Sequence, residues 1–217
     1  MAWAIVQAAL VFLHEGDRAG AAAGFDLALE KVPGYAPALA GKARVALAER
    51  RFEDARALLE KAYATQPLVE TAWLLGDACR LGGDAAAAAA AYDKVVSTGR
   101  LHDRRTLSLF LATRRTDLDL AVTLARAEHA ARPGVYSKDA LAWALYRKGD
   151  LDGARRLSDD AIAFGTPDAR LLFHAGAIRL AQGDASGRGL VKRALATDAA
   201  FDVVEAEEAR ALVATGV

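Results

Sequence analysis

Small and apolar residues recur along the chain at the spacing of a helix. In the segment TAWLLGDACRL they fall at i, i+3, i+4 and i+7, namely Ala72, Leu75, Gly76 and Cys79. A second segment has the same kind of pattern at Ala55, Leu58, Leu59 and Ala62. This spacing puts the small and apolar side chains on one face of a helix. The pattern therefore predicts helices whose small residues let them approach one another closely.

The pattern returns at a fixed interval. A small residue recurs at intervals of 34, 33, 33, 33 and 33 residues: Ala21, Ala55, Ala88, Ala121, Ala154 and Gly187. Seven residues further on, a second series follows: Ala28, Ala62, Val95, Glu128, Ala161 and Ala194. A constant period of this length is the signature of a repeat protein. We therefore expect modules that each bury an apolar face against the next.

Turn signals lie between the two helices of each repeat. Gly-Asp stands at 16–17, 83–84, 149–150 and 183–184, and Arg50-Arg51 and Thr116-Asp117 fill the same position in the other two repeats. Glycine ends a helix in left-handed backbone, and aspartate caps the next helix by accepting hydrogen bonds from its first N–H groups. Each repeat is therefore predicted to be a helix, a tight turn and a second helix.

These features resemble the tetratricopeptide repeat (TPR) family, whose unit is a helical hairpin of about 34 residues. The segments LGDACRLGGDAAAAAAAYDKV and LAWALYRKGDLDGARRL carry the resemblance most directly. It extends over a single domain, 1–217, with a capping helix at 202–215 and repeats at about 2–34, 35–67, 69–100, 102–133, 135–166 and 168–200. The chain departs from the family at Glu128, where a small residue is expected, and at Arg179, where a hydrophobic one is.

The resemblance implies an all-α fold in which about six antiparallel hairpins stack into a right-handed superhelix, an α-α solenoid with a C-terminal capping helix. In this family the first helices of the hairpins line a concave groove, and the groove or the edges bind peptides and proteins. Catalysis is not part of the pattern. The resemblance therefore implies a protein or peptide partner, no enzymatic activity and no cofactor.

Positions on the first helices, rotated by one residue from the buried face, are predicted to line that groove. Aromatic rings and arginines gather there, and such residues are common in binding hot spots. The predicted groove residues are Arg44, Trp73, Asp77, Phe110, Arg114, Asp139, Trp143, Arg147 and Phe173. A peptide or short helix with apolar anchors and a carboxylate would suit this surface. The alternative for the aromatic rings is packing between neighbouring hairpins.

The helix predicted at 2–13 is apolar nearly all round, so we expect its outer side to expose hydrophobic residues. Trp3, Val6 and Leu10 are therefore candidates for self-association into a homo-oligomer, or for packing on a partner or on further sequence. The alternative is that the helix tilts and hides this surface within the chain.

The C-terminal segment DVVEAEEARALV is predicted to cover the last hairpin. Its apolar residues are available for packing: Val203, Val204, Ala206 and Leu212. Its charged residues are expected to point largely toward water: Glu205, Glu207, Glu208 and Arg210.

The sequence contains no recognisable catalytic or metal-binding pattern. His14, His102, His129 and His174 lie in separate regions, and none belongs to an HExxH motif or another metal-ligand spacing. GxSxG and GxxxxGK segments are also missing. We therefore expect solvated or capping roles for all four histidines. A co-chaperone type of clamp, which holds a terminal carboxylate with Lys and Asn, is not expected because the chain contains no Asn.

Charge and composition exclude several further classes of protein. The 28 Lys and Arg residues balance 28 Asp and Glu residues, so no long-range field attracts nucleic acid or an anionic membrane. The single Cys79 rules out a disulfide framework. The apolar segment 2–13 lacks the basic region of a signal peptide and is too short for membrane insertion. Without a clear signal peptide the cytoplasm is favoured, and the compartment otherwise stays unknown.

The sequence therefore predicts a protein-binding scaffold that works through a concave groove. One alternative is an oligomerisation module that assembles through the apolar N-terminal helix. Another is a regulatory or substrate-presenting domain of a larger enzyme or complex.

Overall fold

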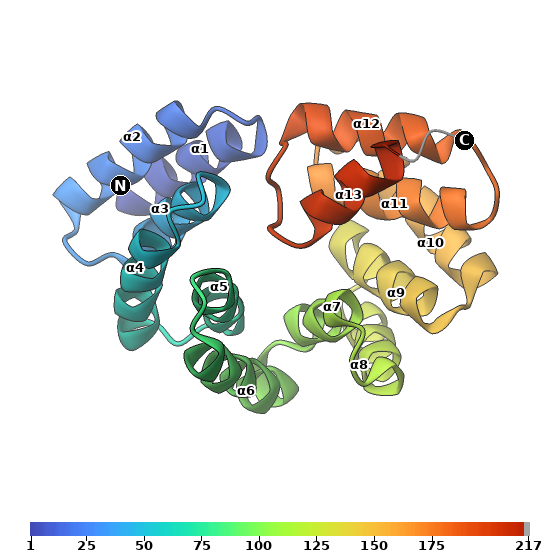
Figure 1. Ribbon diagram of the computed structural model, residues 1–217, viewed down its shortest axis with the longest axis horizontal. Helices are drawn as coiled ribbons and strands as arrows, with labels where there is room; N and C mark the ends of the chain where they lie inside the picture. The colour runs from blue at the N-terminus through green and yellow to red at the C-terminus, as the bar shows by residue number, and fades with distance from the viewer. Residues whose placement is uncertain (215–217) are drawn as a thin grey trace. The chain divides into compact units, whose positions relative to one another are not determined.

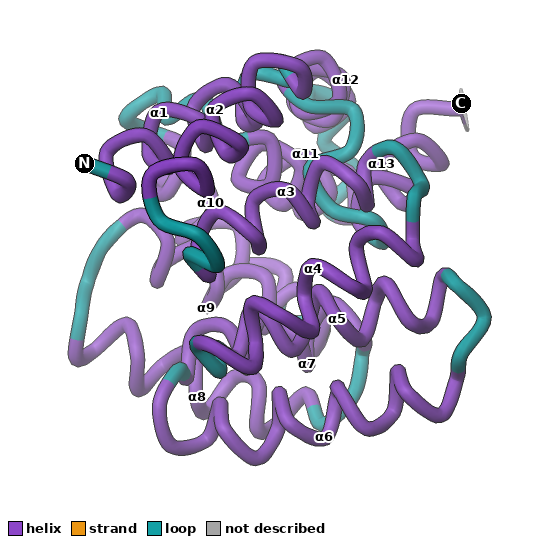
Figure 2. Tube along the Cα trace, turned by 90° about the vertical axis from the view of Figure 1, so that its left-hand side faces the viewer, coloured by secondary structure: helices purple, strands orange, loops and turns teal. Residues whose placement is uncertain are grey.

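The computed structural model describes residues 1–214. Over these residues the chain consists of helices joined by short loops and turns, without a strand (Figure 2). This confirms the predicted all-α class. The described helices (Figure 1) are α1 (Ala2–His14), α2 (Arg18–Lys31), α3 (Ala36–Ala48), α4 (Phe52–Thr65), α5 (Val69–Leu81), α6 (Ala85–His102), α7 (Arg104–Arg114), α8 (Leu118–Ala131), α9 (Val135–Lys148), α10 (Leu151–Ile162), α11 (Ala169–Ala181), α12 (Gly187–Thr197) and α13 (Glu205–Ala214).

Consecutive helices pair as hairpins, from α1 with α2 to α11 with α12, and α13 follows the last hairpin. Helix α6 continues to His102, past residue 100, where the sequence placed the end of the third repeat. Helix α13 lies inside the predicted capping segment 202–215, and residue 215 is outside the described residues. The predicted helix, turn, helix order therefore describes the local structure of each repeat.

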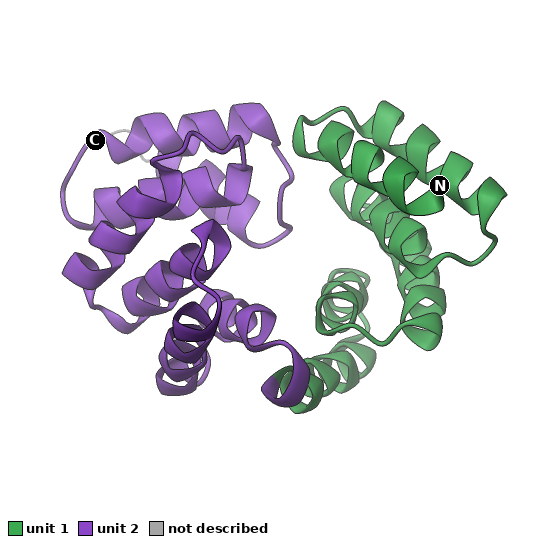
Figure 3. Cartoon of the chain, turned by 180° about the vertical axis from the view of Figure 1, so that it is seen from behind, with its two compact units in different colours: residues 1–99 green, residues 100–217 purple. Residues whose placement is uncertain are grey.

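The chain divides into two compact units, and the boundary between them in the sequence falls in the last turn of α6 (Figure 3). Unit 1 is Met1–Gly99, and unit 2 begins at Arg100. The core of unit 1 includes Val6, Phe25 and Val45 from its first three helices. The largest fully buried side chains of unit 2 include Trp143 and Phe173. Each unit thus has a hydrophobic core of its own.

The two series of positions found in the sequence are buried. All six members of the first series and all six of the second have less than a tenth of their surface exposed. Glu128, the charged member, is buried because Arg132 pairs with it, with Nε and Oε1 3.0 Å apart. The small residues therefore face neighbouring helices, as the periodicity predicted.

The turns between paired helices carry the predicted caps. The carboxylates of Asp17, Asp84 and Asp150 each accept a hydrogen bond at 2.9 Å from a backbone N–H three residues later. The repeats without Gly-Asp place Arg50 and Arg115 in left-handed backbone, with φ of 60° and 55°. Non-glycine residues in this conformation cost about 1 kcal/mol or more. A left-handed residue thus remains in both turns, but in the fourth repeat it is Arg115 and not Thr116, the residue predicted in the glycine position.

Gly76 on α5 shows why a small residue is needed between paired helices. A Cβ at this position would lie 2.2 Å from Cε1 of Tyr92 on α6, far inside van der Waals contact. The Tyr92 hydroxyl continues past Gly76 and donates a hydrogen bond to Oδ1 of Asp77 at 2.6 Å. The missing side chain thus brings the two helices close enough for this partly buried polar contact.

Candidate functional site

The groove residues predicted in unit 1 lie on α3 and α5. Arg44 on α3 pairs with Glu70 on α5, with Nη2 and Oε1 2.7 Å apart, and both side chains are partly exposed. Trp73 and Asp77 on α5 are buried, and Asp77 is held by the Tyr92 hydroxyl. Of the three predicted residues in this unit, Arg44 is the one that presents a partly exposed charged group.

The candidate self-association residues on α1 separate into buried and exposed ones. Val6 is buried in the core of unit 1, and Leu10 packs against that core while remaining partly exposed. Trp3 is 66% exposed, and Val11 and Phe12 on the same helix are also exposed. Helix α1 thus buries one side on its own unit and presents an aromatic and aliphatic surface on another.

The groove residues predicted in unit 2 are mostly covered. Phe110 on α7, Asp139 and Trp143 on α9 and Phe173 on α11 are buried, and Arg114 on α7 is half-buried. The side chain of Arg147, also on α9, is only 3% exposed. In this structure, therefore, the rings of Trp143 and Phe173 pack inside the unit and do not line an open wall.

Helix α13 covers part of this surface. It packs on α11 and α12 (Figure 1). Glu205, its first residue, is fully buried and accepts a hydrogen bond from the Thr113 hydroxyl of α7 at 2.6 Å. Glu208, one turn later, pairs with Arg147 of α9 through two hydrogen bonds of 2.9 and 2.5 Å. Two carboxylates of α13 thus connect this helix to α7 and to α9.

A buried histidine lies at the centre of these contacts. Nδ1 of His174 on α11 is 2.9 Å from Oδ1 of Asp139, and its Nε2 lies 3.3 Å from Oε1 of Glu205, an ion-pair contact without good hydrogen-bond alignment. Arg170 adds a second cation, with Nε 3.1 Å from Oε2 of Glu205 and Nη2 2.8 Å from Oδ2 of Asp202. The two cations of α11, Arg170 and His174, are therefore each in contact with carboxylates from α9 or from the start of α13.

Aromatic stacking holds the histidine in place. The imidazole of His174 stacks on the indole of Trp143, with ring centroids 3.8 Å apart and planes 12° from parallel. The guanidinium of Arg147 lies 4.0 Å from the indole centroid. Nε1 of Trp143 donates to the Thr113 hydroxyl at 3.1 Å, and that hydroxyl donates to Glu205. Trp143 is therefore part of the charged network as well as of the core.

The network fixes the protonation of its members. Burial opposes a charge on His174, but the carboxylates of Asp139 and Glu205 outweigh it and raise the pKa of His174 to about 9. Burial also opposes a charge on Glu205, but His174 and Arg170 lower the pKa of Glu205 to about 2. Burial and the neighbouring Glu205 raise the pKa of Asp202. At neutral pH, His174 is a buried imidazolium and Glu205 is its buried counter-ion.

Two expectations from the sequence are therefore wrong. His174 is fully buried and is neither solvated nor a helix cap. Glu205 points into unit 2 and Glu208 is half-buried against Arg147, so neither faces water as expected, whereas Glu207 and Arg210 of the same helix are exposed as predicted. The physical reason is mutual: each charge is buried because the other neutralises it. The available signal was the position of His174, directly after the predicted groove residue Phe173.

Several solved structures resemble the chain, although no family model and no curated protein matches its sequence. A chain of the APC/C hetero-tetramer Cut9-Hcn1 aligns with a TM-score of 0.55 and 16% identity, over 98% of this chain and 42% of that one. Yeast Tom70 aligns with a TM-score of 0.53 and 14% identity, over 97% and 45%. PilW, a widely conserved type IV pilus biogenesis factor, aligns with a TM-score of 0.51 and 19% identity, over 90% and 92%. The chain has the tetratricopeptide repeat fold. It spans less than half of the Cut9-Hcn1 and Tom70 chains.

In the TPR fold of this chain, α7, α9 and α11 are the first helices of three successive hairpins. They contact one another in order, α7 with α9 and α9 with α11. Below, "acceptor surface" means the residues of unit 2 that contact or surround the α13 carboxylates: Thr113, Arg115, Asp139, Trp143, Arg147, Arg170 and His174. The acceptor surface is the candidate binding site of unit 2.

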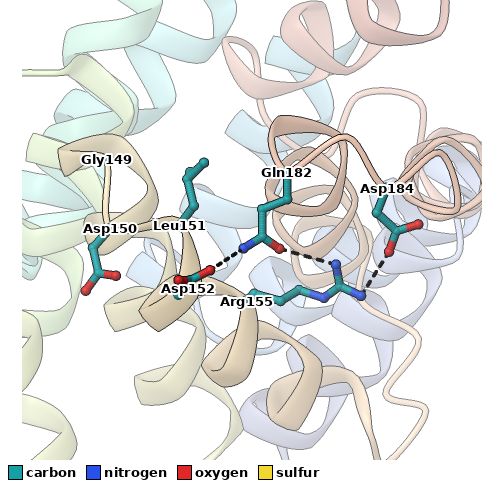
Figure 4. Close-up of a pocket in the computed structure, with 7 residues that line it drawn as sticks. All are labelled: Gly149, Asp150, Leu151, Asp152, Arg155, Gln182 and Asp184. Atoms are coloured by element: carbon teal, nitrogen blue, oxygen red, sulfur yellow. Dashed lines mark hydrogen bonds and ion pairs between the residues drawn. The ribbon is translucent and has the colours of Figure 1, made fainter.

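An open depression of about 640 Å³ lies elsewhere on unit 2, between the α9–α10 and α11–α12 turns (Figure 4). Its polar groups bond to one another: Gln182 donates to Asp152 at 3.0 Å, and Arg155 pairs with Asp184 at 2.9 Å. Arg56 makes the equivalent pair with Asp84 in unit 1, at 3.0 Å. The recurrence indicates a link between successive TPR hairpins and not a ligand site.

Two further features bear on function. Among residues 1–214, no group of three or more His, Cys, Asp and Glu side chains is arranged to hold a metal ion. In the same range no helix combines the length and the apolar character needed to cross a bilayer.

Proposed function

We propose that the chain is a protein-binding scaffold whose partner is a peptide or helix held on the first helices of its TPR hairpins. One observation carries the proposal: in unit 2 these helices already hold a helical segment, α13, through ion pairs and hydrogen bonds. Charge-assisted hydrogen bonds and partly buried arginines are common means of holding a helix in a groove.

Charge reversal at the more exposed predicted groove positions tests this proposal. Arg44→Glu in unit 1 and Arg114→Glu in unit 2 are each expected to reduce affinity for a protein captured with the wild-type chain by about tenfold or more, which corresponds to about 1.4 kcal/mol. Affinity capture from the source organism identifies the partner, and titration with the purified partner measures the change.

The controls carry the same charge reversal on second helices. Lys61→Glu on α4 and Arg126→Glu on α8 are exposed and are expected to leave the affinity unchanged. A partner that binds all four variants equally well would show that the first helices are not the binding face.

Helix α1 favours a second function, self-association. Trp3 is 66% exposed, with Val11 and Phe12 exposed on the same helix. Exposed aromatic and aliphatic side chains are common in interfaces between subunits. We propose that two copies bury this surface together, which is the oligomerisation alternative.

Replacing Trp3 and Phe12 together by glutamate is expected to abolish the association, because each carboxylate would have to be desolvated in the interface. Sedimentation equilibrium over a range of protein concentrations measures the mass. Phe164→Glu is the matched control, since Phe164 is 81% exposed on another part of the chain. A wild-type chain that stays monomeric at all concentrations would remove this function from consideration.

A further inference from the structure

Helix α13 presents its charges to opposite sides. Glu205 and Glu208 lie one turn apart and point to the acceptor surface, where Glu205 contacts Thr113, Arg170 and His174. Glu208 contacts Arg147 and, at 3.4 Å, Arg115. Glu207 and Arg210 lie on the exposed side of the helix and pair with each other at 2.9 Å. The helix is thus bound through a pair of carboxylates at i and i+3.

The acceptor surface needs such a pair. It carries four cations against one carboxylate, Asp139: Arg147 and His174 are buried, Arg170 is partly exposed and Arg115 is exposed. Asp202, which precedes α13, pairs with Arg170. Burying cations without counter-ions is strongly unfavourable. Whatever segment covers this surface must therefore bring carboxylates to it, and their spacing must match the distance between the two groups of cations.

The apolar side chains that α13 buries fully are small. Besides Glu205, its buried residues are Ala206 and Ala209. Alanine side chains bury little apolar area, and the hydrophobic contribution scales with that area. The helix is 10 residues long, a length that is marginal for a helix outside a protein context. The contacts that α13 makes with α7 and α9 are therefore those of its carboxylates, and a segment that adds larger apolar side chains to the same pair would compete with it.

We propose that α13 is an internal ligand that occupies the acceptor surface until a partner helix with two carboxylates at i and i+3 replaces it. This rests on the proposed scaffold function and specifies its partner and its regulation. Binding of the partner then includes the free energy needed to release α13, so the affinity measured for the whole chain is lower than that of the uncovered surface.

The test uses the full chain and a labelled synthetic peptide, DVVEAEEARALVA, which copies residues 202–214. Wild type is expected to bind it weakly because α13 is in place. In Glu208→Arg, the new arginine of α13 is repelled by Arg147 and Arg115. We expect this variant of the chain to bind the peptide at least tenfold more tightly than wild type. Glu208→Gln, which removes the pairing without repulsion, should give an intermediate gain. Fluorescence anisotropy measures the binding, and circular dichroism checks that each variant is folded.

Three controls separate release of α13 from general loosening of the fold. Glu207→Arg makes the same charge change on the exposed side of α13 and is expected to bind like wild type. Arg147→Glu combined with Glu208→Arg restores an opposite-charge pair and should lower peptide binding again. A peptide with glutamine in place of both inward-facing glutamates should fail to bind any variant.

Three results would overturn the proposal: equal peptide binding by all variants, a gain with Glu207→Arg as large as with Glu208→Arg, or dimers of Glu208→Arg that exchange α13 between copies. Failure of the proposed scaffold function would appear in the partner-capture experiment. If the peptide results are as expected but no captured partner responds to Arg44→Glu or Arg114→Glu, internal binding of α13 stands and the scaffold does not.

Discussion

Replacing Glu205 with alanine is expected to lower the free energy of unfolding of unit 2 by about 3–5 kcal/mol, the usual cost of removing one partner from a buried ion pair. The change leaves His174 and Arg170 buried without this carboxylate, and the Thr113 hydroxyl loses its acceptor. It also removes the contact that joins α13 to α7. The loss is therefore far greater than that of an exposed charge.

Denaturant unfolding followed by tryptophan fluorescence measures this loss. Trp143 is the tryptophan of unit 2 and lies in the network itself, whereas Trp3 and Trp73 belong to unit 1. Glu207→Ala is the matched control on the same helix, where the side chain is exposed and a change below about 0.5 kcal/mol is expected. If the two variants unfold at the same denaturant concentration, Glu205 is not the anchor described above.

Stability is also expected to fall as the pH rises from about 6.5 to 9. The folded protein raises the pKa of His174 from its ordinary 6.5 to about 9. The stabilisation from its charge is therefore complete below about pH 6.5 and is lost progressively as the pH rises through 9. A shift of this size corresponds to roughly 3 kcal/mol. Glu205 contributes to the same contact, so the two shifts describe one interaction.

At acid pH, stability depends on Glu205. The pKa of Glu205 falls from 4.5 to about 2, so its contribution is present above about pH 4.5 and is lost as the pH falls toward 2. The network is therefore most stabilising between about pH 4.5 and 6.5. Denaturant unfolding at pH 6.5 and at pH 9 compares the two ends of the alkaline window.

His174→Gln is expected to be less stable at pH 6.5 and to lose most of the difference between pH 6.5 and 9. His102→Gln changes an exposed histidine of the same unit and is expected to keep the wild-type difference. An identical pH dependence in wild type and His174→Gln would contradict the assignment of a buried imidazolium.

Periodicity was enough to predict the helices and their contacts. A small residue every 33 or 34 positions has one simple explanation, close approach of helices, and Ala55, Ala88 and Ala154 are buried accordingly. Capping by Asp17, Asp84 and Asp150 was equally readable, because it depends on residues three positions apart. These features are local, so the sequence shows them directly.

The charged network depends on residues far apart in the sequence. Asp139 and His174 are separated by 35 positions, and Thr113 and Glu205 by 92. A charged residue met alone in a sequence is most simply interpreted as solvated, which is why Glu205 was expected to face water. The burial of Trp143 follows from stacking on His174 and packing against Phe173. Binding of a partner by Arg44 and Arg114 stays a prediction.

The left-handed backbone at Arg115 has a cost and a use. A glycine in that turn would relax the local conformation, as it does in the turns that contain Gly149 and Gly183. The arginine, however, extends to Glu208 of α13. Arg50 adopts the same backbone in unit 1, where its guanidinium lies over the ring of Phe52. Replacing Arg50 with glycine would therefore only relieve backbone strain in its turn. Replacing Arg115 with glycine would also remove a contact that fastens the C-terminal helix α13.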